Sequence, residues 1–391
     1  MANRFIKFFS EMPGNLIRIT SGSRFIPEID GLRFLAIFPV VIMHFTERLS
    51  RANSTDLTNF DQKIVHLLSN GHVGVYLFFA ISGFILALPF GNQKLNNNGS
   101  LPLSKYYLRR LTRLEPPYLI VMTLLLLALV IVKKEDFYNL IPHFIASIFY
   151  VHRFIYGTWS PINPPAWTLE IEVQFYAIAP FLALLYFSIQ KKWIRRSIIL
   201  SLIFFKIVVD NTTTIFDPTY LTLPFVIQFF VIGIIMADLF LTDWKNGIFT
   251  QRIFDFISII SFIIMLSTWT WGKDLSWKFV FIISLLMLFY GSFRSITFNK
   301  FLKNKWVTAI GGMCYTIYLL HLVMAEVFVL IFQKLSPDIP FIAKLIIGLS
   351  IFLPVLFIIS SLFFLLIEKP CMDPEWPKKL RAWTISVFSS H

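Results

Sequence analysis

The sequence has 391 residues, of which 56% are apolar, 17% aromatic and only 15% charged, and its mean hydropathy is +0.70. About a quarter of the residues in an ordinary soluble domain are charged, so this composition excludes a disordered chain, a disulfide-rich scaffold and most water-soluble folds. The net charge of +13 fits Lys- and Arg-rich cytoplasmic loops better than nucleic-acid binding. We therefore expect an all-α polytopic integral membrane protein.

The N-terminal residues 1–27 are basic and lack the apolar core and cleavage site of a signal peptide, so we expect a cytoplasmic, partly interfacial extension. Apolar runs that fit bilayer-crossing helices follow it. We predict ten spans, at residues 32–49, 73–90, 115–132, 167–188, 196–210, 221–241, 253–271, 276–293, 307–332 and 341–367. The apolar run at 137–156 contains Pro, His and Arg and is interpreted as interfacial or re-entrant. The membrane domain covers 28–370, and 371–391 forms a short cytoplasmic tail.

The distribution of Lys and Arg predicts how these spans are oriented. With the N-terminus in the cytoplasm, six segments lie inside, and five of them carry at least four basic residues. No loop on the opposite side carries more than three. Because cytoplasmic loops are enriched in Lys and Arg, we expect about ten transmembrane helices with both termini cytoplasmic.

The first span carries two ionisable side chains, Arg33 and His44, and such groups are costly at membrane depth unless they have a role. Their spacing places them on nearly one helix face, about 16 Å apart along the axis. With Arg33 at the cytoplasmic edge of a hydrocarbon layer about 30 Å thick, His44 lies near its middle. An imidazole there is able to take a proton from a hydroxyl and return it. A structural His bonded to a neighbouring helix is an equal alternative for this span alone.

Three other spans bring polar side chains to a similar depth. Glu172 lies about 7–8 Å below the outer edge of its span, and His321 lies about 20 Å from the inner edge of another. Ser82 lies at mid-depth in the second span. We expect these three side chains to meet His44 in one layer and to form a functional cavity. Glu170 lies nearer the outer surface and is interpreted as solvated.

Below the third span, Arg110 and Arg113 share a helical face near the cytoplasmic edge, at the level of Arg33. Guanidinium groups suit bidentate phosphate binding. Three arginines around a cavity mouth therefore indicate an anionic ligand that enters from the cytoplasm. Anchoring by the positive-inside rule is the alternative for each arginine taken alone.

Sites for other cofactors are missing from the sequence. The two cysteines, Cys314 and Cys371, provide neither a disulfide framework nor a cysteine-based metal site, and no metal is expected. No stretch resembles a P-loop or a Gly-rich dinucleotide turn.

Five sequence stretches occur in a recognisable order. They are EIDGLRFLA at 28–36 with His44 behind it, GVYLFFAISGF at 74–84, RLTRLEPPY at 110–118, WTLEIEVQFY at 167–176, and YTIYLLH at 315–321 with IEKP at 367–370. Together, with ten residues between Arg33 and His44, they resemble the membrane acyltransferase-3 family, which transfers acyl groups, commonly acetyl, to sugars and other acceptors. The family often has an acidic residue where this chain has Tyr76. This departure bears on how the acceptor is recognised and not on the assignment to a class of enzyme.

The resemblance implies a role for each site residue. His44 is the expected catalytic base, and Glu172 and His321 would orient it or the acceptor. Arg33, Arg110 and Arg113 would bind acyl-CoA. The expected substrate-binding residues are Ser82, Trp167, Tyr176 and Tyr318.

The implied function is transfer of an acyl group, most simply acetyl, from cytoplasmic acetyl-CoA or another acyl-CoA to a hydroxyl at the outer face. The acceptor would be a glycan or a lipid-linked sugar, such as a polysaccharide or lipopolysaccharide precursor. The expected partners are membrane lipid, acyl-CoA and this acceptor, with no nucleic acid. The resemblance implies a multi-pass protein of the bacterial inner membrane. Direct transfer and an acyl-enzyme at His44 both remain open.

Two other function classes fit parts of the sequence. Buried His and Glu in ten spans would also suit a proton-coupled transporter or a flippase of glycan precursors. The sequence has no clear inverted repeat of the transporter kind, which argues against that class. A non-catalytic glycan-binding or structural membrane subunit is the third possibility. Release of free CoA from labelled acyl-CoA distinguishes an acyltransferase from a carrier, because a carrier releases no CoA.

Overall fold

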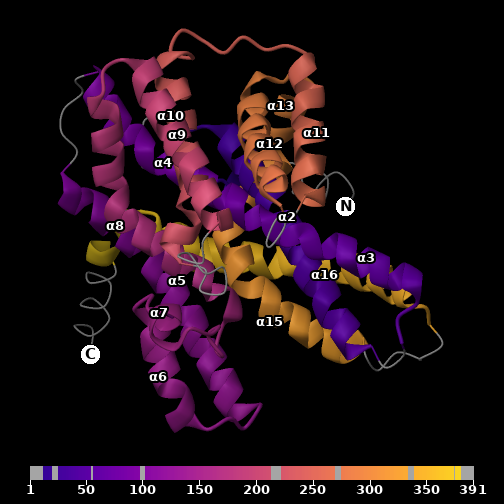
Figure 1. Cartoon of the computed structure of the whole chain (residues 1–391). Coiled ribbons are helices and arrows are strands. Elements are labelled where there is room, and N and C mark those ends of the chain that lie inside the picture. Colours follow the sequence, from indigo (N-terminus) through magenta and orange to yellow (C-terminus); the bar gives the residue numbers. More distant parts are fainter. Residues whose placement is uncertain are drawn as a thin grey trace, which may run out of the picture.

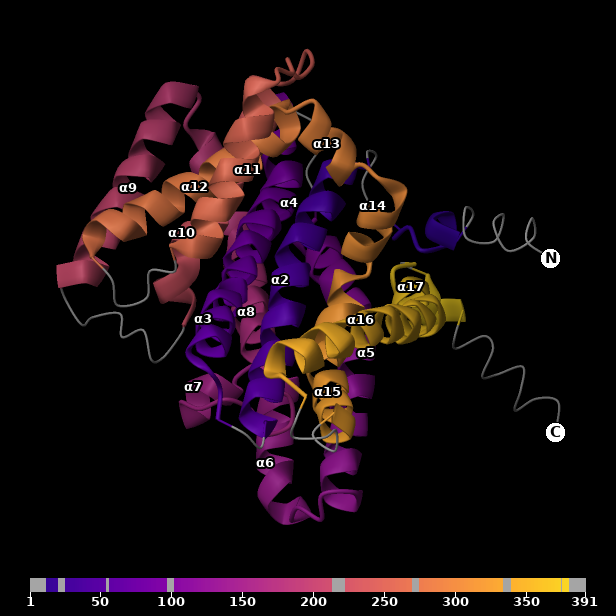
Figure 2. The same ribbon diagram turned by 90° about the vertical axis from the view of Figure 1, so that its right-hand side faces the viewer.

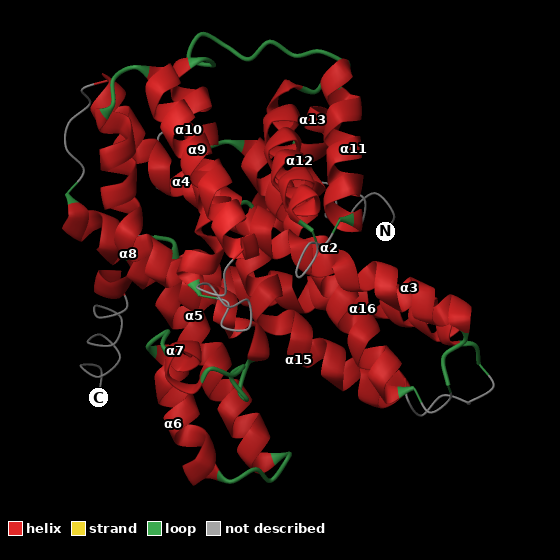
Figure 3. Cartoon of the chain, in the orientation of Figure 1, coloured by secondary structure: helices red, strands yellow, loops and turns green. Residues whose placement is uncertain are grey.

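The apolar runs fold into helices in the computed structural model of the chain, and its described residues contain no strand (Figures 1 and 3). Helices are expected because backbone groups in hydrocarbon must satisfy their hydrogen bonds within the chain. The described residues are 12–19, 25–53, 56–96, 102–212, 222–268, 274–332, 339–373 and 375–379. The predicted all-α membrane fold is thus confirmed.

The helices follow one another along the chain with short connections. The first part contains α2 (Pro27–Ala52), α3 (Asn59–Ser69), the 3₁₀ turn η1 (Asn70–Val73), α4 (Gly74–Asn96), α5 (Leu103–Ile131), α6 (Phe137–Ile148), α7 (His152–Tyr156), η2 (Pro164–Ala166), α8 (Trp167–Ser188) and α9 (Lys192–Thr212). The second part contains α10 (Leu223–Thr242), α11 (Ile253–Ser267), α12 (Leu275–Arg294), α13 (Thr297–Leu302), α14 (Lys305–Gly312), α15 (Cys314–Phe332), α16 (Phe341–Phe363), the π-helical turn η4 (Phe364–Glu368) and α17 (Lys369–Cys371).

Eight helical stretches in the described residues are long and apolar enough to cross a membrane. They correspond to eight of the ten predicted spans. The predicted span at 196–210 lies in α9, which is 21 residues long but carries several charges. The predicted span at 253–271 lies partly in α11, which has 15 residues, and residues 269–271 lie outside the described part. The run at 137–156 forms α6 and α7, each too short to cross, and the count of ten stays a prediction.

The segments predicted to be cytoplasmic are the N-terminal segment, the loops near 91–114, 190–196, 242–252 and 294–306, and the C-terminal segment. In the described residues, all six meet at one end of the helix bundle. Their contacts are Lys303 Nζ to Glu28 Oε1, Lys369 Nζ to Asn15 O, Trp376 Nε1 to Thr112 O, Lys245 Nζ to Asn96 Oδ1, Lys192 Nζ to Asp243 Oδ1 and Arg294 Nε to Phe249 O. The arrangement agrees with the predicted order of crossings. Which side of a membrane this end faces remains a prediction.

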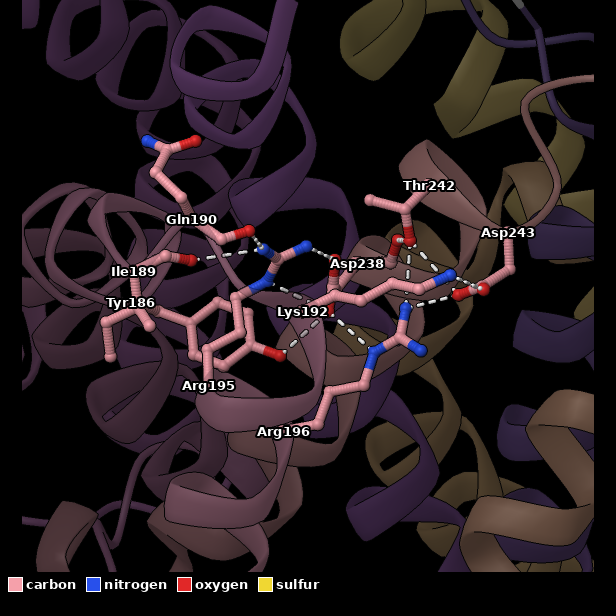
Figure 4. Close-up of polar contacts among 9 residues, drawn as sticks. All are labelled: Tyr186, Ile189, Gln190, Lys192, Arg195, Arg196, Asp238, Thr242 and Asp243. Atoms are coloured by element: carbon pink, nitrogen blue, oxygen red, sulfur yellow. Dashed lines mark hydrogen bonds and ion pairs between the residues drawn. The ribbon is translucent and has the colours of Figure 1, made fainter.

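A buried ionic network fixes α9 against α10 at this end (Figure 4). The Arg195 side chain is 1% exposed and pairs with the fully buried Asp238. Arg196 Nε donates to the same carboxylate at 2.8 Å, and its Nη2 donates to both Thr242 Oγ1 and Asp243 Oδ2. Arg195 also donates to the carbonyl oxygens of Ile189 and Gln190, directly after the end of α8, at 3.1 and 3.0 Å. Two arginines of the predicted cytoplasmic loop at 190–196 therefore lie buried inside the protein, where charges must be paired.

Close contact between α4 and α10 positions one wall of the candidate site. A Cβ on Gly83 would lie 1.9 Å from the Phe230 carbonyl oxygen, and one on Gly233 would lie 2.0 Å from that of Ala80. Only glycine allows the two backbones to approach so closely. This packing holds the neighbouring Ser82 on the side of α4 that faces α8.

Candidate functional site

Five helices, α2, α4, α5, α8 and α15, together with the end of α14, enclose a cavity with about 890 Å³ of space that no atom fills, including its open part. Seven of the residues predicted from the sequence line it. They are Arg33, Ser82, Arg110, Arg113, Glu172, Tyr176 and Tyr318. We call this space the arginine cavity. His44, His321 and Trp167 do not line it.

The arginines give this cavity a positive lining. Arg33 Nη1 donates to Asp30 Oδ1 at 2.9 Å, and the same carboxylate accepts from Arg18 Nε. The Arg110 guanidinium lies 5.7 Å from the centre of the Tyr176 ring, close enough for a cation–π contact. The Nε atom of Arg113 is buried and has no hydrogen-bond partner among the described residues. An unpartnered guanidinium nitrogen beside two further arginines suits an anionic ligand.

Glu172 is held within this cavity by two hydroxyl groups. Ser82 Oγ donates to Glu172 Oε1 at 2.6 Å across the α4–α8 contact. Tyr176, one turn later on α8, donates its hydroxyl to the same oxygen at 2.5 Å. The carboxylate thus balances part of the arginine charge, and the structure places it with the arginines rather than beside His44.

The two histidines form a separate pair, with ring centroids 5.2 Å apart. His321 is fully buried, and its Nδ1 lies 2.7 Å from the Tyr318 carbonyl oxygen. A carbonyl only accepts, so Nδ1 carries the proton, and Nε2 is left as a base without a partner among the described residues. His44 is 22% exposed, and its Nδ1 lies 3.4 Å from Glu47 Oε2. This is an ion-pair contact and not a hydrogen bond. A proton on Nδ1 faces the carboxylate and leaves Nε2 of His44 as the basic atom.

Tyr318 lies between the arginine cavity and the histidine pair. It lines the cavity, and its ring centroid is 5.9 Å from that of His321. Its hydroxyl donates to the Pro165 carbonyl oxygen and accepts from Thr168 Oγ1 at 2.7 Å. On α2, Val40 lines the cavity one helical turn, about 6 Å, before His44. The histidine pair therefore lies just beyond the end of the cavity, between α2 and α15, and His44 faces another helix.

Two residues at the start of α8 differ in their surroundings from the sequence-based view. Glu170, expected to be solvated, is 2% exposed, and its Oε2 accepts from the Arg153 backbone N–H at 2.9 Å. Its burial follows from the fold of α7 over this end of α8, which the sequence did not indicate. Trp167, expected to bind substrate, packs edge-on against Trp159 at 5.5 Å, away from the cavity.

Sequence reasoning missed three residues at this site. Glu47 is the carboxylate in contact with His44, and its position three residues later on the same helix face was the available signal. Asp30 binds two arginines, including Arg33 at the same i, i+3 spacing. Cys314 places a thiol in the cavity lining. In the described part of the chain, no three His, Cys, Asp or Glu residues lie together as metal ligands would.

Comparison with known proteins gives a consistent result. Residues 26–366 match a family model described as an acyltransferase domain, that of the acyltransferase-3 family. The O-acetyltransferase OatA of Staphylococcus aureus strain NCTC 8325 is 27% identical over 321 residues, covering 76% of this chain and 50% of OatA. A protein of strain COL, whose name marks it as a presumed O-acetyltransferase, is 24% identical over 326 residues with the same coverage. The chain spans about half the length of the curated relatives it matches. No solved structure matches it significantly.

Proposed function

The chain belongs to the acyltransferase-3 family, and from this premise we propose that it is an integral membrane O-acetyltransferase that moves an acetyl group from acetyl-CoA to a hydroxyl of a glycan. The relatives' names describe the same transfer to oxygen. The observation that carries the proposal is the gathering of seven motif residues around one cavity, with the histidine pair just beyond its end.

The donor is acetyl-CoA or another acyl-CoA, which enters from the cytoplasm. The cavity is lined by Arg33, Arg110 and Arg113. These arginines lie toward the end of the bundle at which the predicted cytoplasmic segments meet. The phosphates of CoA stay with these arginines, because charged groups cross the hydrocarbon layer only at high cost. The thin pantetheine arm extends along the cavity and brings the thioester toward Tyr318 and the histidine pair.

In the direct route, His44 Nε2 removes the proton from the acceptor hydroxyl while the hydroxyl oxygen attacks the thioester carbonyl carbon. The carbon–sulfur bond breaks, and the CoA sulfur leaves with the proton that the imidazole returns. In the alternative route, the imidazole first accepts the acyl group and then passes it to the hydroxyl oxygen. Both routes use Nε2 of His44, which is the ring nitrogen that does not face Glu47.

The acceptor is a glycan or a lipid-linked sugar that arrives from the outer face. His44 lies one turn before the charged end of α2, where Arg48 Nε lies 3.4 Å from Glu326 Oε1 of α15. This end is opposite the one that joins the predicted cytoplasmic segments. A location in a bacterial inner membrane fits a cytoplasmic donor and an external acceptor.

Transfer is tested with the purified protein in lipid nanodiscs, radiolabelled acetyl-CoA and a hydroxyl-bearing glycan. We expect acetyl-glycan and an equal amount of free CoA thiol to form together. The competing function is a carrier of glycan precursors, which would release no CoA thiol.

The donor site has a built-in reporter, because Cys314 lines the arginine cavity and Cys371 does not. In a Cys371→Ser background, we expect CoA to slow the alkylation of Cys314 by a thiol reagent. The added substitution Arg113→Gln weakens this protection, whereas Lys300→Gln, outside the cavity, leaves it unchanged. Unaltered alkylation at saturating CoA would place the donor elsewhere.

A further inference from the structure

A second groove lies at the end of the bundle where the predicted cytoplasmic segments meet. Ile19, Leu365, Lys369, Trp376 and Lys379 are among its lining residues, and the groove holds about 830 Å³ of space that no atom fills, including its open part. We call it the C-terminal groove. Figure 2 shows α17 and the indigo N-terminal segment on the same side of the bundle as α14. The IEKP stretch at 367–370 contributes Lys369 and Pro370 to it, although the sequence predicts no role for these two residues.

The C-terminal groove adjoins the arginine cavity across α5. Trp376 Nε1 donates to the Thr112 carbonyl oxygen at 3.0 Å, and the next residue, Arg113, lines the cavity. From the other side, Ile19 in the groove follows Arg18, which binds Asp30 together with Arg33. Burial and the nearby Arg33 and Arg113 lower the pKa of Arg18 to about 9. A row of basic groups thus joins the two spaces.

The side chains of the groove fit one chemical class of ligand. Trp376, Ile19 and Leu365 supply an aromatic and aliphatic wall for the flat face of a purine. Lys369 Nζ donates to the Asn15 carbonyl oxygen at 2.6 Å. This acceptor is neutral, so the contact does not neutralise the positive charge of the lysine. Lys379 pairs with Asp373 at 2.5 Å at the open edge. A lysine beside a stacking surface is suited to a phosphorylated nucleoside.

We propose that the C-terminal groove binds the adenosine 3′,5′-bisphosphate end of the acyl-CoA donor, while its pantetheine arm occupies the arginine cavity. This inference rests on the proposed function, since it takes acyl-CoA to be the donor. It assigns to the segment after the membrane domain a part in donor recognition. A purely anchoring role would use the same residue types, because Trp and Lys also gather at membrane interfaces. The bond from Trp376 to α5, beside Arg113, favours the nucleotide.

The inference is tested by comparing two donors in the same assay. Acetyl-CoA carries the nucleotide, and acetyl-phosphopantetheine lacks it. We expect Trp376→Ala to raise KM for acetyl-CoA by about five- to hundredfold and to leave KM for acetyl-phosphopantetheine unchanged. We expect Lys369→Gln to raise KM for acetyl-CoA as well. Trp376→Phe keeps a ring that stacks, so its KM for acetyl-CoA should stay close to the wild-type value. Trp277→Ala, an exposed tryptophan on α12 far from the groove, is the matched control.

An equal rise in KM for both donors, or none for either, would overturn the inference. A direct measurement keeps it separate from the transfer reaction. Adenosine 3′,5′-bisphosphate is titrated calorimetrically into the full chain in nanodiscs, and binding that Trp376→Ala weakens supports the groove even if no acetyl transfer is found. Absence of binding in the wild type overturns it. Sensitivity of the variants to anionic lipid, without any effect on bisphosphate binding, would identify the groove as a headgroup site and also overturn it.

Discussion

The imidazole rings of His44 on α2 and His321 on α15 lie with their centroids 5.2 Å apart. The hydrogen bond between His321 Nδ1 and the Tyr318 carbonyl fixes one ring, and the contact with Glu47 orients the other. Both Nε2 atoms are thereby left as proton acceptors. The pair joins two distant parts of the sequence directly beyond the arginine cavity.

Replacing His44 with Ala is expected to lower kcat for acetyl transfer by about 10²–10⁴-fold, which is the usual contribution of a general base. His321→Gln keeps a polar group of similar size and is expected to give a smaller loss. The measurement is CoA thiol release by purified variants that insert normally. His66→Ala is the control, because His66 is exposed on α3 and lies outside both sites. Full activity of His44→Ala would remove the residue from the mechanism.

Glu47→Gln removes the charge beside His44 Nδ1 and keeps the shape of the side chain. Because the carboxylate favours a proton on Nδ1, its loss leaves the imidazole free to present the wrong nitrogen. We expect kcat to fall by less than in His44→Ala, with KM for acetyl-CoA unchanged, since Glu47 is not part of the arginine cavity. Steady-state kinetics separates the two constants. Glu326→Gln, at the same end of the bundle, is the control, and a rise in KM with unchanged kcat would contradict the assigned role.

The helical fold was predictable from the sequence because long apolar runs leave the backbone few alternatives in a membrane. Charged runs were harder to interpret. Arg195 and Arg196 count as surface charges in the sequence, yet they lie buried against Asp238 on another helix. Such a pairing depends on which helices are neighbours, and the local pattern carries no information on that.

The motifs identified the residues of the arginine cavity, but depth arithmetic did not give their grouping. It placed His44, Ser82, Glu172 and His321 in one layer. The structure instead joins them two by two, with Ser82 and Glu172 in hydrogen-bond contact and the two histidines in ring contact. Helical rise gives depth along one axis only. Lateral position depends on packing and tilt, as the oblique crossing of α16 and α2 illustrates (Figure 2).

The buried network at Asp238 gives a prediction about stability rather than activity. Asp238→Asn leaves two guanidinium groups without their shared counter-charge in the interior. Breaking a buried ion pair from one side costs about 3–5 kcal/mol, so we expect a clear fall in the thermal unfolding temperature of the detergent-solubilised protein. Glu375→Gln disrupts the exposed pair with Lys378 and should change stability by less than about 0.5 kcal/mol. Equal unfolding temperatures in both variants would argue against a structural role for the network.

We expect the contact between His143 and His152 to make the α6–α7 segment sensitive to acid. The ring nitrogens lie 2.8 Å apart, and burial with the neighbouring His143 lowers the pKa of His152 from 6.5 to about 4. Arg153 on its own helix and Tyr156 also lie close to it, and Glu170 on α8 accepts from the Arg153 N–H. An opened segment binds the proton at its ordinary pKa, so acid favours opening.

The stability from a neutral His152 is complete above about pH 6.5 and is lost progressively as the pH falls toward 4. We therefore expect hydrogen exchange of residues 137–156 to be faster at pH 5 than at pH 7, after correction for the intrinsic rate. His152→Gln does not titrate and should reduce this difference, while α4 provides an internal reference in the same sample. A difference of the same size in His152→Gln would show that another group controls the segment.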